Sequence, residues 1–310
     1  MQRNSLISIM GPTGIGKTNL AFQLYDSTDV EIISVDSVQV YKHLNIGSGK
    51  PEKAVLKKYP HKLINVIEPY ESYSTGKFQA DCINEIKKIK LSNKIPLLVG
   101  GTMLYFKNLF DGLSELPEST EEIRKQVELE CNHKGLEVMH EYLKEIDPIS
   151  AKNIHPNDPQ RIKRAIEVYR LTNKPLSLLH QENLVEKHKD LKTFDIHQFA
   201  IKPKDKEVHR EKVAIRFQDM IDQGLIKEVE GILNKKEMDS SKTSMKSVGY
   251  KQVADYLEGT LTFDEMISKA VTATRQLAKR QMTWLRSWNR IVWLEEDSEN
   301  NLDIILNTVN

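Results

Sequence analysis

The stretch Gly11-Pro-Thr-Gly-Ile-Gly-Lys-Thr18 constrains the fold of this chain more than any other feature of its sequence. It follows the apolar run LISIM and precedes NLAFQLY, in which apolar residues recur at helical spacing. A strand, the pattern Gly-x-x-x-x-Gly-Lys-Thr and a helix in this order predict a P-loop, because a plain glycine turn would need chance to supply all three. In a P-loop, N–H groups from Gly14 to Thr18 surround an anion, Lys17 adds a positive charge and the Thr18 hydroxyl can bind Mg²⁺. The motif predicts a polyphosphate or diphosphate, without specifying ATP.

Short apolar runs, separated by helix-like or loop segments, predict the rest of the core. They lie at residues 6–10, 30–36, 62–67, 95–101, 195–203 and 290–294. Such runs are typical of buried strands in a parallel sheet that helices cover on both faces. From about Gly112 to Asp195 the segments are amphipathic and rich in helix formers, which predicts an all-helical insertion. We therefore expect an α/β core formed by residues 1–111 and 196–310, an insertion domain at 112–195, and a plain tail at the end of the chain.

Composition excludes several classes of protein. The chain has 310 residues, of which 39% are hydrophobic and 29% charged, with a net charge of +1. This is ordinary for a soluble globular protein, and it lacks the strongly basic character of a dedicated nucleic-acid binder. Two cysteines, Cys82 and Cys131, without a Cys-x-x-Cys pair, argue against disulfides or zinc and favour a cytoplasmic location. No run approaches the length of a membrane span, so we expect no membrane association.

Basic residues nevertheless gather locally. From Lys269 to Arg290 the chain has six Lys or Arg residues and no acid. Trp284 and Trp288 are four residues apart, which predicts that they share one face of a helix. For the tryptophans, burial is favoured over stacking on a base. For the cations, the absence of balancing acids favours a surface that faces phosphates.

A second basic segment, Gln160-Arg-Ile-Lys-Arg164, follows the residues HPNDP. Asn157 or Asp158 can cap a helix that has Pro159 in its first turn. Positive charges at a helix start oppose the usual preference of the helix dipole for acids. This arrangement suggests an external anion.

Two more segments follow predicted strands, at the edge where α/β proteins place their chemistry. Asp36 ends one strand and can hold Mg²⁺ through water, accept a proton from a nucleophile or cap a turn. Gly100 and Gly101 end another strand, where they allow close approach to the backbone or simply form a tight turn. Thr102 can bond a ligand there.

The motifs together resemble those of the bacterial tRNA dimethylallyltransferases, also called tRNA isopentenyltransferases. The resemblance runs from the P-loop nearly to Leu294 and rests on GPTGIGKT, ISVDSVQVYKHLNIGSGKP, IPLLVGGTMLYFKNLFDGL, HPNDPQRIKRAIEVYR, SVGYKQ and ATRQLAKRQMTWLR. It implies a P-loop NTPase-like core with a helical insertion that grips the anticodon arm. It implies transfer of a dimethylallyl group from dimethylallyl diphosphate to N6 of adenosine 37 in tRNA. Ile15 stands where many relatives have Ser, which matters little because backbone groups bind the phosphates.

The resemblance also implies roles for individual residues. Asp36, Lys17 and Thr102 would be catalytic, and Thr18 would bind Mg²⁺, the expected cofactor. The diphosphate would be bound by Gly11, Thr13, Gly14, Ile15, Gly16, Lys17, Thr18 and Arg216, although a surface salt bridge explains Arg216 nearly as well. The tRNA-contacting positions would be Asp36, Ser37, Val38, Gln39, Thr102, Arg124, Gln160, Arg161, Ile162, Lys163, Arg164, Lys246, Ser247, Val248, Gly249, Tyr250, Lys251, Lys279, Arg280, Gln281 and Arg286.

Two other interpretations remain at this point. In a P-loop nucleoside or small-molecule kinase the loop would bind ATP and Asp36 would activate a hydroxyl. The basic segments favour the tRNA enzyme, because a small-molecule kinase does not need them. In a non-catalytic RNA-binding module the P-loop would have decayed, but Lys17, Thr18 and Asp36 are intact. The expected partners are the tRNA anticodon stem-loop and dimethylallyl diphosphate, and we expect a monomer.

Overall fold

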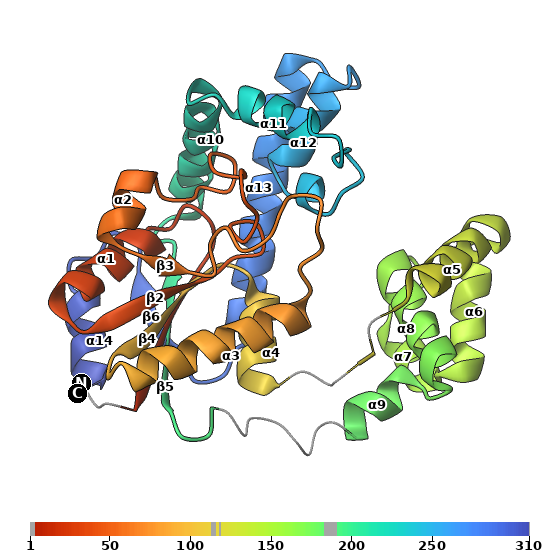
Figure 1. Ribbon diagram of the computed structural model, residues 1–310, viewed down its shortest axis with the longest axis horizontal. Coiled ribbons are helices and arrows are strands. Elements are labelled where there is room, and N and C mark those ends of the chain that lie inside the picture. The colour runs from red at the N-terminus through yellow and green to blue at the C-terminus, as the bar shows by residue number, and fades with distance from the viewer. Residues whose placement is uncertain (1–3, 113–115, 118, 183–190, 310) are drawn as a thin grey trace. The chain divides into compact units, whose positions relative to one another are not determined.

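The computed structural model of the chain describes residues 4–112, 116–117, 119–182 and 191–309. Over these residues, six parallel strands form one sheet in the spatial order β3-β2-β4-β1-β5-β6 (Figure 1). The predicted α/β class with a parallel sheet is therefore confirmed. The strands are β1 (Ser5–Met10), β2 (Val30–Val35), β3 (His61–Lys62), β4 (Ile95–Gly100), β5 (Asp195–Lys202) and β6 (Val292–Glu295).

The register of the central strands brings three chemically important segments together. β4 lies between β1 and β2, and its last residue, Gly100, pairs with both Met10 and Val35. The P-loop follows β1, Asp36 follows β2 and Gly101 follows β4. Because parallel strands end at the same edge of a sheet, these segments meet there.

The described chain divides into two compact units, of which the first combines Met1–Lys107 with Asp190–Asn310. Ile7, Ile9 and Phe199 share a buried core with α1 and α14, while α3 packs on β2 and β4. The helices are α1 (Lys17–Ser27), α2 (Lys53–Lys58), α3 (Thr75–Leu91), α4 (Met103–Asp111), which begins here, α10 (Lys206–Asp222), α11 (Leu225–Leu233), α12 (Tyr250–Leu257), α13 (Phe263–Arg286) and α14 (Asn301–Val309), with a 3₁₀ turn η2 (Ser244–Lys246).

Two expectations about these elements are wrong. The run 62–67 does not form a strand, since β3 covers only His61–Lys62. Leu63 and Asn65 have φ of +61° and +56°, and a left-handed backbone cannot continue a β ladder. The end of the chain is not a plain tail, because α14 buries Ile305 and Val309 in the core that it shares with α1.

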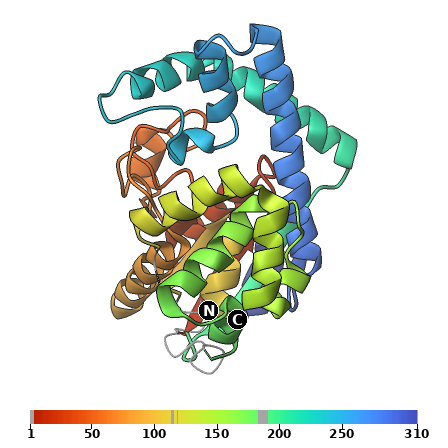
Figure 2. The ribbon, with the colours of Figure 1, turned by 90° about the vertical axis from the view of Figure 1, so that its right-hand side faces the viewer.

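The second unit, Asn108–Lys189, contains helices and no strand among its described residues (Figure 2). The periodic segment 121–146 forms two helices, α5 and α6. Gly135, with a φ of +84°, separates them. Val127, Leu143, Ile162 and Ile166 form its core. The helices are α5 (Glu121–Lys134), α6 (Leu136–Ile146), α7 (Pro148–Asn153), α8 (Pro159–Thr172) and α9 (Leu176–Glu182).

The long helix α13 connects two parts of the first unit. It packs against α12 near its start and against α10 further along, and its end reaches the sheet (Figure 1). Thr262 caps its first turn through the N–H of Glu265. The helix ends at Arg286, so Trp288 lies beyond it and the two tryptophans do not share a helical face as predicted. None of the described helices combines the length and apolar character that a membrane span requires.

Candidate functional site

The P-loop takes the conformation that its glycines permit. Gly14 and Gly16 have φ of +76° and +91°, in the left-handed region that disfavours other residues. Gly16 directly precedes α1, so the free N–H groups of the first turn lie at the loop. A Cβ at Gly11 would lie 3.0 Å from Cγ2 of Ile15 and 3.2 Å from the carbonyl oxygen of Ile201. This is the geometry of an anion site at a helix N-terminus.

Lys17 folds back onto this loop. Its Nζ donates hydrogen bonds to the carbonyl oxygens of Gly11, at 3.0 Å, and Pro12, at 2.6 Å. Burial lowers the pKa of Lys17 to about 7, while the Asp36 carboxylate acts in the opposite direction and Arg216 lowers the pKa further. An anion in the loop would favour the charged ammonium.

A cavity of about 370 Å³ lies at the P-loop. The predicted loop residues from Thr13 to Thr18 line it, and so does Arg216. Its other lining residues come from the ends of β2 and β4, from β3, α1 and α13, and from neighbouring loops: Asn19, Ser34, Asp36, Gln39, Ser48, Gly49, Pro51, His61, Val99, Gly100, Gly101, Gln281 and Asp297.

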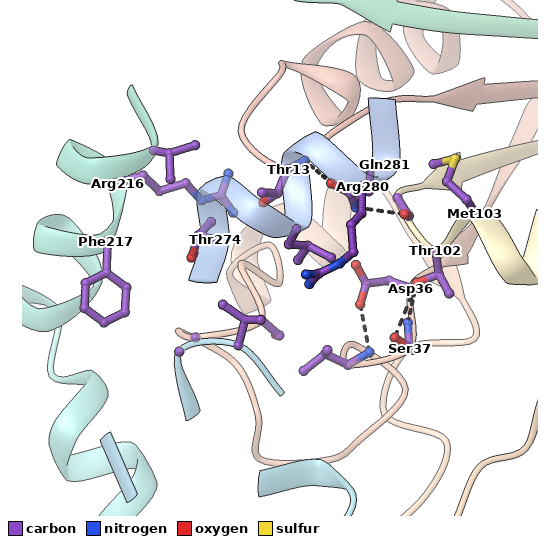
Figure 3. Close-up of a pocket in the computed structure, with 18 of the residues that line it drawn as sticks. Thr13, Asp36, Ser37, Thr102, Met103, Arg216, Phe217, Thr274, Arg280 and Gln281 are labelled. Atoms are coloured by element: carbon purple, nitrogen blue, oxygen red, sulfur yellow. Dashed lines mark hydrogen bonds between the residues drawn. The ribbon is translucent and has the colours of Figure 1, made fainter. Parts of the chain in front are cut away.

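A second cavity of about 320 Å³ adjoins the first (Figure 3). Both are lined by Thr13, Asp36, Ser48, Gly101, Arg216 and Gln281, so they meet along this wall. The remaining lining residues are largely apolar: Ser37, Val38, Gly47, Thr102, Met103, Leu104, Val213, Phe217, Met220, Val248, Gly249, Thr274, Leu277, Arg280 and Trp284. A polar cavity thus opens beside a more apolar one.

Asp36 stands at this junction with its carboxylate partly engaged. Its Oδ1 accepts hydrogen bonds from the N–H groups of Val38, at 2.8 Å, and Gln39, at 3.2 Å. Thr102 lies close by, since its Oγ1 accepts a hydrogen bond from the N–H of Ser37 at 3.0 Å. The turn-capping role considered from sequence is therefore real. It does not compete with chemistry, because Asp36 also lines both cavities.

Arg216 extends from α10 to the shared wall. Among the described residues it has no ion pair or hydrogen bond, which differs from the surface salt bridge considered from sequence. Burial lowers its pKa, and Asp36 acts in the opposite direction. A Cβ at Gly49 would lie 1.9 Å from Nη2 of Arg216, so only glycine lets the guanidinium lie against this loop. An unpaired, half-buried cation suits an anionic ligand.

Glu228, which sequence reasoning missed, holds the wall formed by the loop before Lys50. Its carboxylate accepts hydrogen bonds from the N–H groups of residues 45–47 at 2.9 to 3.3 Å and from the hydroxyl of Tyr250 at 2.7 Å. Tyr250 has no exposed surface, and burial raises its pKa. The Tyr250 side chain therefore has no exposed surface with which to make the predicted contact with tRNA. Its visible role is to pack against Gly47, where a Cβ would lie 2.7 Å from the ring.

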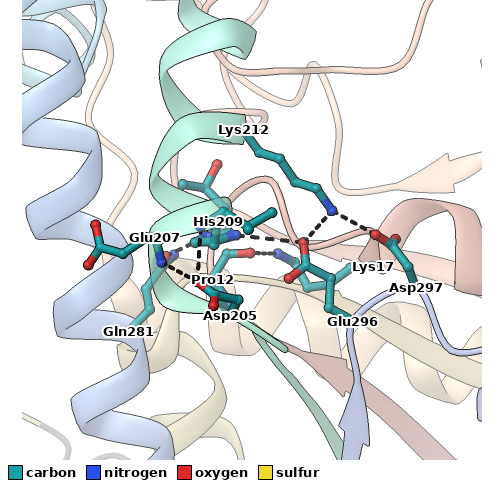
Figure 4. Close-up of polar contacts among 11 residues, drawn as sticks. Pro12, Lys17, Asp205, Glu207, His209, Lys212, Gln281, Glu296 and Asp297 are labelled. Atoms are coloured by element: carbon teal, nitrogen blue, oxygen red, sulfur yellow. Dashed lines mark hydrogen bonds and ion pairs between the residues drawn. The ribbon is translucent and has the colours of Figure 1, made fainter.

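A polar group behind the P-loop was also missed (Figure 4). Lys212 Nζ bonds Oε1 of Glu296 at 2.8 Å and Oδ2 of Asp297 at 2.6 Å. His209 Nδ1 lies 3.9 Å from the same Glu296 oxygen, and its ring nitrogens have no hydrogen-bond partner among the described residues. Burial lowers the pKa of His209, so its ring stays neutral beside Lys17.

The lysine, arginine and glutamine residues of the first unit that were predicted to contact tRNA fall into two groups. Lys246, Lys251, Lys279, Arg280 and Arg286 are exposed, and Arg280 also lines the second cavity. Gln39 and Gln281 instead hold the site together. Gln39 donates weakly to the carbonyls of Ser48 and Gly49 at 3.4 and 3.5 Å, and Gln281 bonds the backbone of Thr13 and Gly101.

The remaining predicted contacts, Arg124 and Gln160–Arg164, belong to the second unit. Asp158 caps α8 as expected, through the N–H of Arg161 at 3.1 Å. Arg124, Gln160 and Arg161 are exposed, whereas Ile162 is fully buried in the core of this unit. The described residues contain no cluster of three or more His, Cys, Asp or Glu side chains that could hold a metal ion.

The parallel sheet, the P-loop and the two adjoining cavities define a P-loop protein with a second, more apolar cavity beside its anion site. Residues 39–288 match the family model described as IPP transferase. The chain belongs to this family of tRNA prenyltransferases, and the kinase interpretation is not favoured.

Solved structures agree with this assignment. The tRNA isopentenylpyrophosphate transferase of Bacillus halodurans is 30% identical, with a TM-score of 0.71 over 99% of this chain and 95% of that one. The tRNA delta(2)-isopentenylpyrophosphate transferase of Staphylococcus epidermidis is 32% identical, with a TM-score of 0.68 over 98% and 96%. A eukaryotic dimethylallyltransferase acting on tRNA is 26% identical, with a TM-score of 0.79 over 99% and 77%.

Proposed function

We propose that this protein transfers a dimethylallyl group from dimethylallyl diphosphate to N6 of adenosine 37 in tRNA and releases diphosphate. The observation that carries the proposal is the pair of adjoining cavities that share Asp36 and Arg216. The cavity lined by the P-loop suits a diphosphate. The cavity with apolar walls suits a prenyl chain and an adenine.

The reaction joins N6 to the allylic carbon as the bond from that carbon to the diphosphate oxygen breaks. Negative charge grows on the departing oxygen, and Lys17, Arg216 and the loop N–H groups stabilise it. The exocyclic amine is a weak nucleophile, because its lone pair is delocalised into the ring. Asp36 orients the amine and accepts its proton as the C–N bond forms.

The residues present fit one Mg²⁺ ion if the diphosphate of the substrate supplies further ligands. Thr18 and Asp36 both line the phosphate cavity, where the Thr18 hydroxyl is the protein ligand that a P-loop supplies and Asp36 would act through water. Bound there, the ion would neutralise charge on the diphosphate. The diphosphate oxygens must complete the coordination, since the described residues form no metal cluster of their own.

An adenine in a stacked anticodon loop cannot reach a cavity of this kind, so the base must flip out of the stack. Lys279, Arg280 and Arg286 lie exposed on α13, where they suit the phosphates beside the flipped nucleotide. We propose that the helical unit holds the rest of the anticodon stem-loop. Both cysteines are free thiols, which supports a reducing cytoplasm as the location of this protein.

One incubation tests the function directly. Purified protein with Mg²⁺, radiolabelled dimethylallyl diphosphate and unmodified tRNA should place label in the RNA, in the digest product N6-dimethylallyladenosine. A parallel incubation with labelled ATP and nucleosides tests the kinase interpretation. Phosphorylated nucleoside without labelled tRNA would overturn the proposal.

Replacement of Asp36 tests its chemical role. Asp36→Asn keeps an oxygen that can cap the turn but removes the basic carboxylate, so turnover should fall by roughly two to four orders of magnitude. Binding of tRNA should change much less. A defect that high Mg²⁺ rescues would indicate a metal ligand instead, and a lower melting temperature with normal turnover would indicate only the cap. Single-turnover rates at several Mg²⁺ concentrations separate these outcomes.

A further inference from the structure

Gln281 lies on α13 between the P-loop and the end of β4 (Figure 3). Its Oε1 accepts a hydrogen bond from the N–H of Thr13 at 3.0 Å, and its Nε2 donates one to the carbonyl oxygen of Gly101 at 2.8 Å. The residue is 8% exposed and lines both cavities. An amide offers an acceptor and a donor from one planar group, so few other side chains can make both bonds.

The two hydrogen bonds continue into the segment that carries Asp36. Thr102 follows Gly101, and its N–H donates to the carbonyl oxygen of Val35 at 3.3 Å. Its Oγ1 accepts a hydrogen bond from the N–H of Ser37 at 3.0 Å. Asp36 lies between Val35 and Ser37 in the chain, so Thr102 holds the backbone on both sides of it. One side chain therefore links the P-loop to Thr102 and, through it, to Asp36.

The glycine at position 101 fits this arrangement. A Cβ there would lie 2.6 Å from Nε2 of Gln281 and 3.3 Å from the carbonyl oxygen of Gly11. Its φ lies outside the left-handed region, so its backbone conformation does not itself require glycine. The close approach of Gln281 does.

We propose that Gln281 is a positioning residue that fixes the diphosphate site relative to Asp36, and that it does not contact the RNA. The inference rests on the proposed function for its effect on turnover. Thr13 and Gly101 lie in the loops that follow the neighbouring strands β1 and β4, so loss of the bridge lets the leaving group and the accepting base shift apart. The reaction rate depends steeply on the distances between the reacting groups. Loss of the bridge should therefore lower turnover more than it weakens RNA binding.

The test uses the full chain and the variant Gln281→Met, which keeps the approximate volume of the side chain and removes both hydrogen bonds. Loss of a buried hydrogen bond with an N–H left unsatisfied predicts a roughly 10-fold weaker affinity for inorganic pyrophosphate, measured by calorimetry without RNA. The kcat should fall by roughly 10-fold or more, while the KM for tRNA stays unchanged. Gln276→Met, exposed on the same helix, is the matched control and should behave as wild type.

A double-mutant cycle tests the contact from its other side. Gly101→Ala should lower kcat/KM by roughly 10-fold, because its methyl group displaces Gln281. In a Gln281→Ala background the same change should have less than about a two-fold effect, since the displaced side chain is gone. Additive losses would overturn the link between Gln281 and Gly101. If Gln281→Met unfolds at too low a temperature to be assayed, Gly101→Ala still tests the contact.

Two results with Gln281→Met overturn the proposal. One is wild-type turnover together with wild-type pyrophosphate affinity. The other is weaker tRNA binding with unchanged kcat, which would make Gln281 an RNA contact. The pyrophosphate measurement needs neither tRNA nor prenyl donor. If wild-type protein failed to transfer a prenyl group, the proposed function would fail while the effect of Gln281 on the P-loop is still measured.

Discussion

The basic segments on α8 and α13 look alike in the sequence and differ in the structure. Each gathers several cations without acids among them. On α8 the structure supplies partners from within the second unit: Asp158 for Arg161, Glu128 for Lys163, and Glu167 with the carbonyl oxygen of Pro117 for Arg164. On α13, Lys279, Arg280 and Arg286 have no ion pair with any residue that the structure describes.

Whether a cation has an acidic partner therefore depends on the folded structure and not on its neighbours in the sequence. Lys163 reaches Glu128 across 35 residues, and Arg170 reaches Glu130 across 40, so the cations of α8 join it to α5. The suggestion of an external anion near the start of α8 is weakened, because internal carboxylates already meet those charges. The α13 cations are available to phosphates. A cation without an acidic partner contributes more binding free energy to a phosphate contact than one that must first break an ion pair.

A pair of matched alanine variants tests whether the α13 cations and the α8 cations differ in function. Arg280→Ala removes a free cation that lines the second cavity, so kcat/KM for tRNA should fall by roughly 10- to 100-fold, the range expected for a nucleic-acid contact. Arg164→Ala should lower it by less than about three-fold, because Arg164 already bonds Pro117 and Glu167. Steady-state kinetics with unmodified tRNA measures both. Equal losses would contradict the distinction.

The salt dependence of tRNA binding gives a smaller but more specific signal. The double variant Lys279→Ala with Arg286→Ala should flatten the plot of log affinity against log salt by about two, because each lost phosphate contact reduces the slope by about one. The double variant Arg161→Ala with Lys163→Ala should change the slope by less than about one. Filter binding at several salt concentrations measures both slopes. A larger change from the α8 pair would reverse the assignment of the RNA-facing surface.

The sequence predicts a structural feature when the residues that determine it lie within one short segment. Strands β1, β2 and β4 are buried on both faces, so their apolar runs identify them without knowledge of the partners. The P-loop is contiguous in the chain and its position follows directly. The run 62–67 is equally apolar, yet Leu63 and Asn65 take left-handed conformations that a local pattern of hydrophobicity cannot reveal.

The site could be predicted only where its parts are local. Asp36 and Thr102 follow strands, so their edge of the sheet was predictable. Gln281 bonds Thr13 across 268 residues, and Glu228 bonds the N–H of Ile46 across 182. A glutamine or a glutamate on a helix gives no sign of a backbone partner so distant. The family resemblance placed Gln281 among the RNA contacts, and only the geometry shows that its amide is already engaged.

The smallest expected effect concerns the α5–α8 contact itself. Hydrogen bonds from Arg170 and then Lys134 lower the pKa of Glu130 from 4.5 to about 2. A carboxyl whose pKa is lower in the folded protein contributes stability above its unfolded pKa, and this contribution is lost as pH falls from 4.5 toward 2. Glu130→Gln should therefore lower the melting temperature slightly at pH 7 and progressively less below pH 4. The expected shift is small, because the pair is partly exposed to solvent.

The control for that experiment is Glu237→Gln, an exposed carboxylate that lies outside the helices and has no ion pair among the described residues. Its melting temperature should match wild type at every pH, since it loses no partner. Glu130→Gln should also leave the salt slope of tRNA binding unchanged, because Arg170 serves α5 and not an RNA. A steeper slope in Glu130→Gln would mean that the freed Arg170 had turned to the phosphates, and that the α8 cations differ from those of α13 only in having a partner at hand.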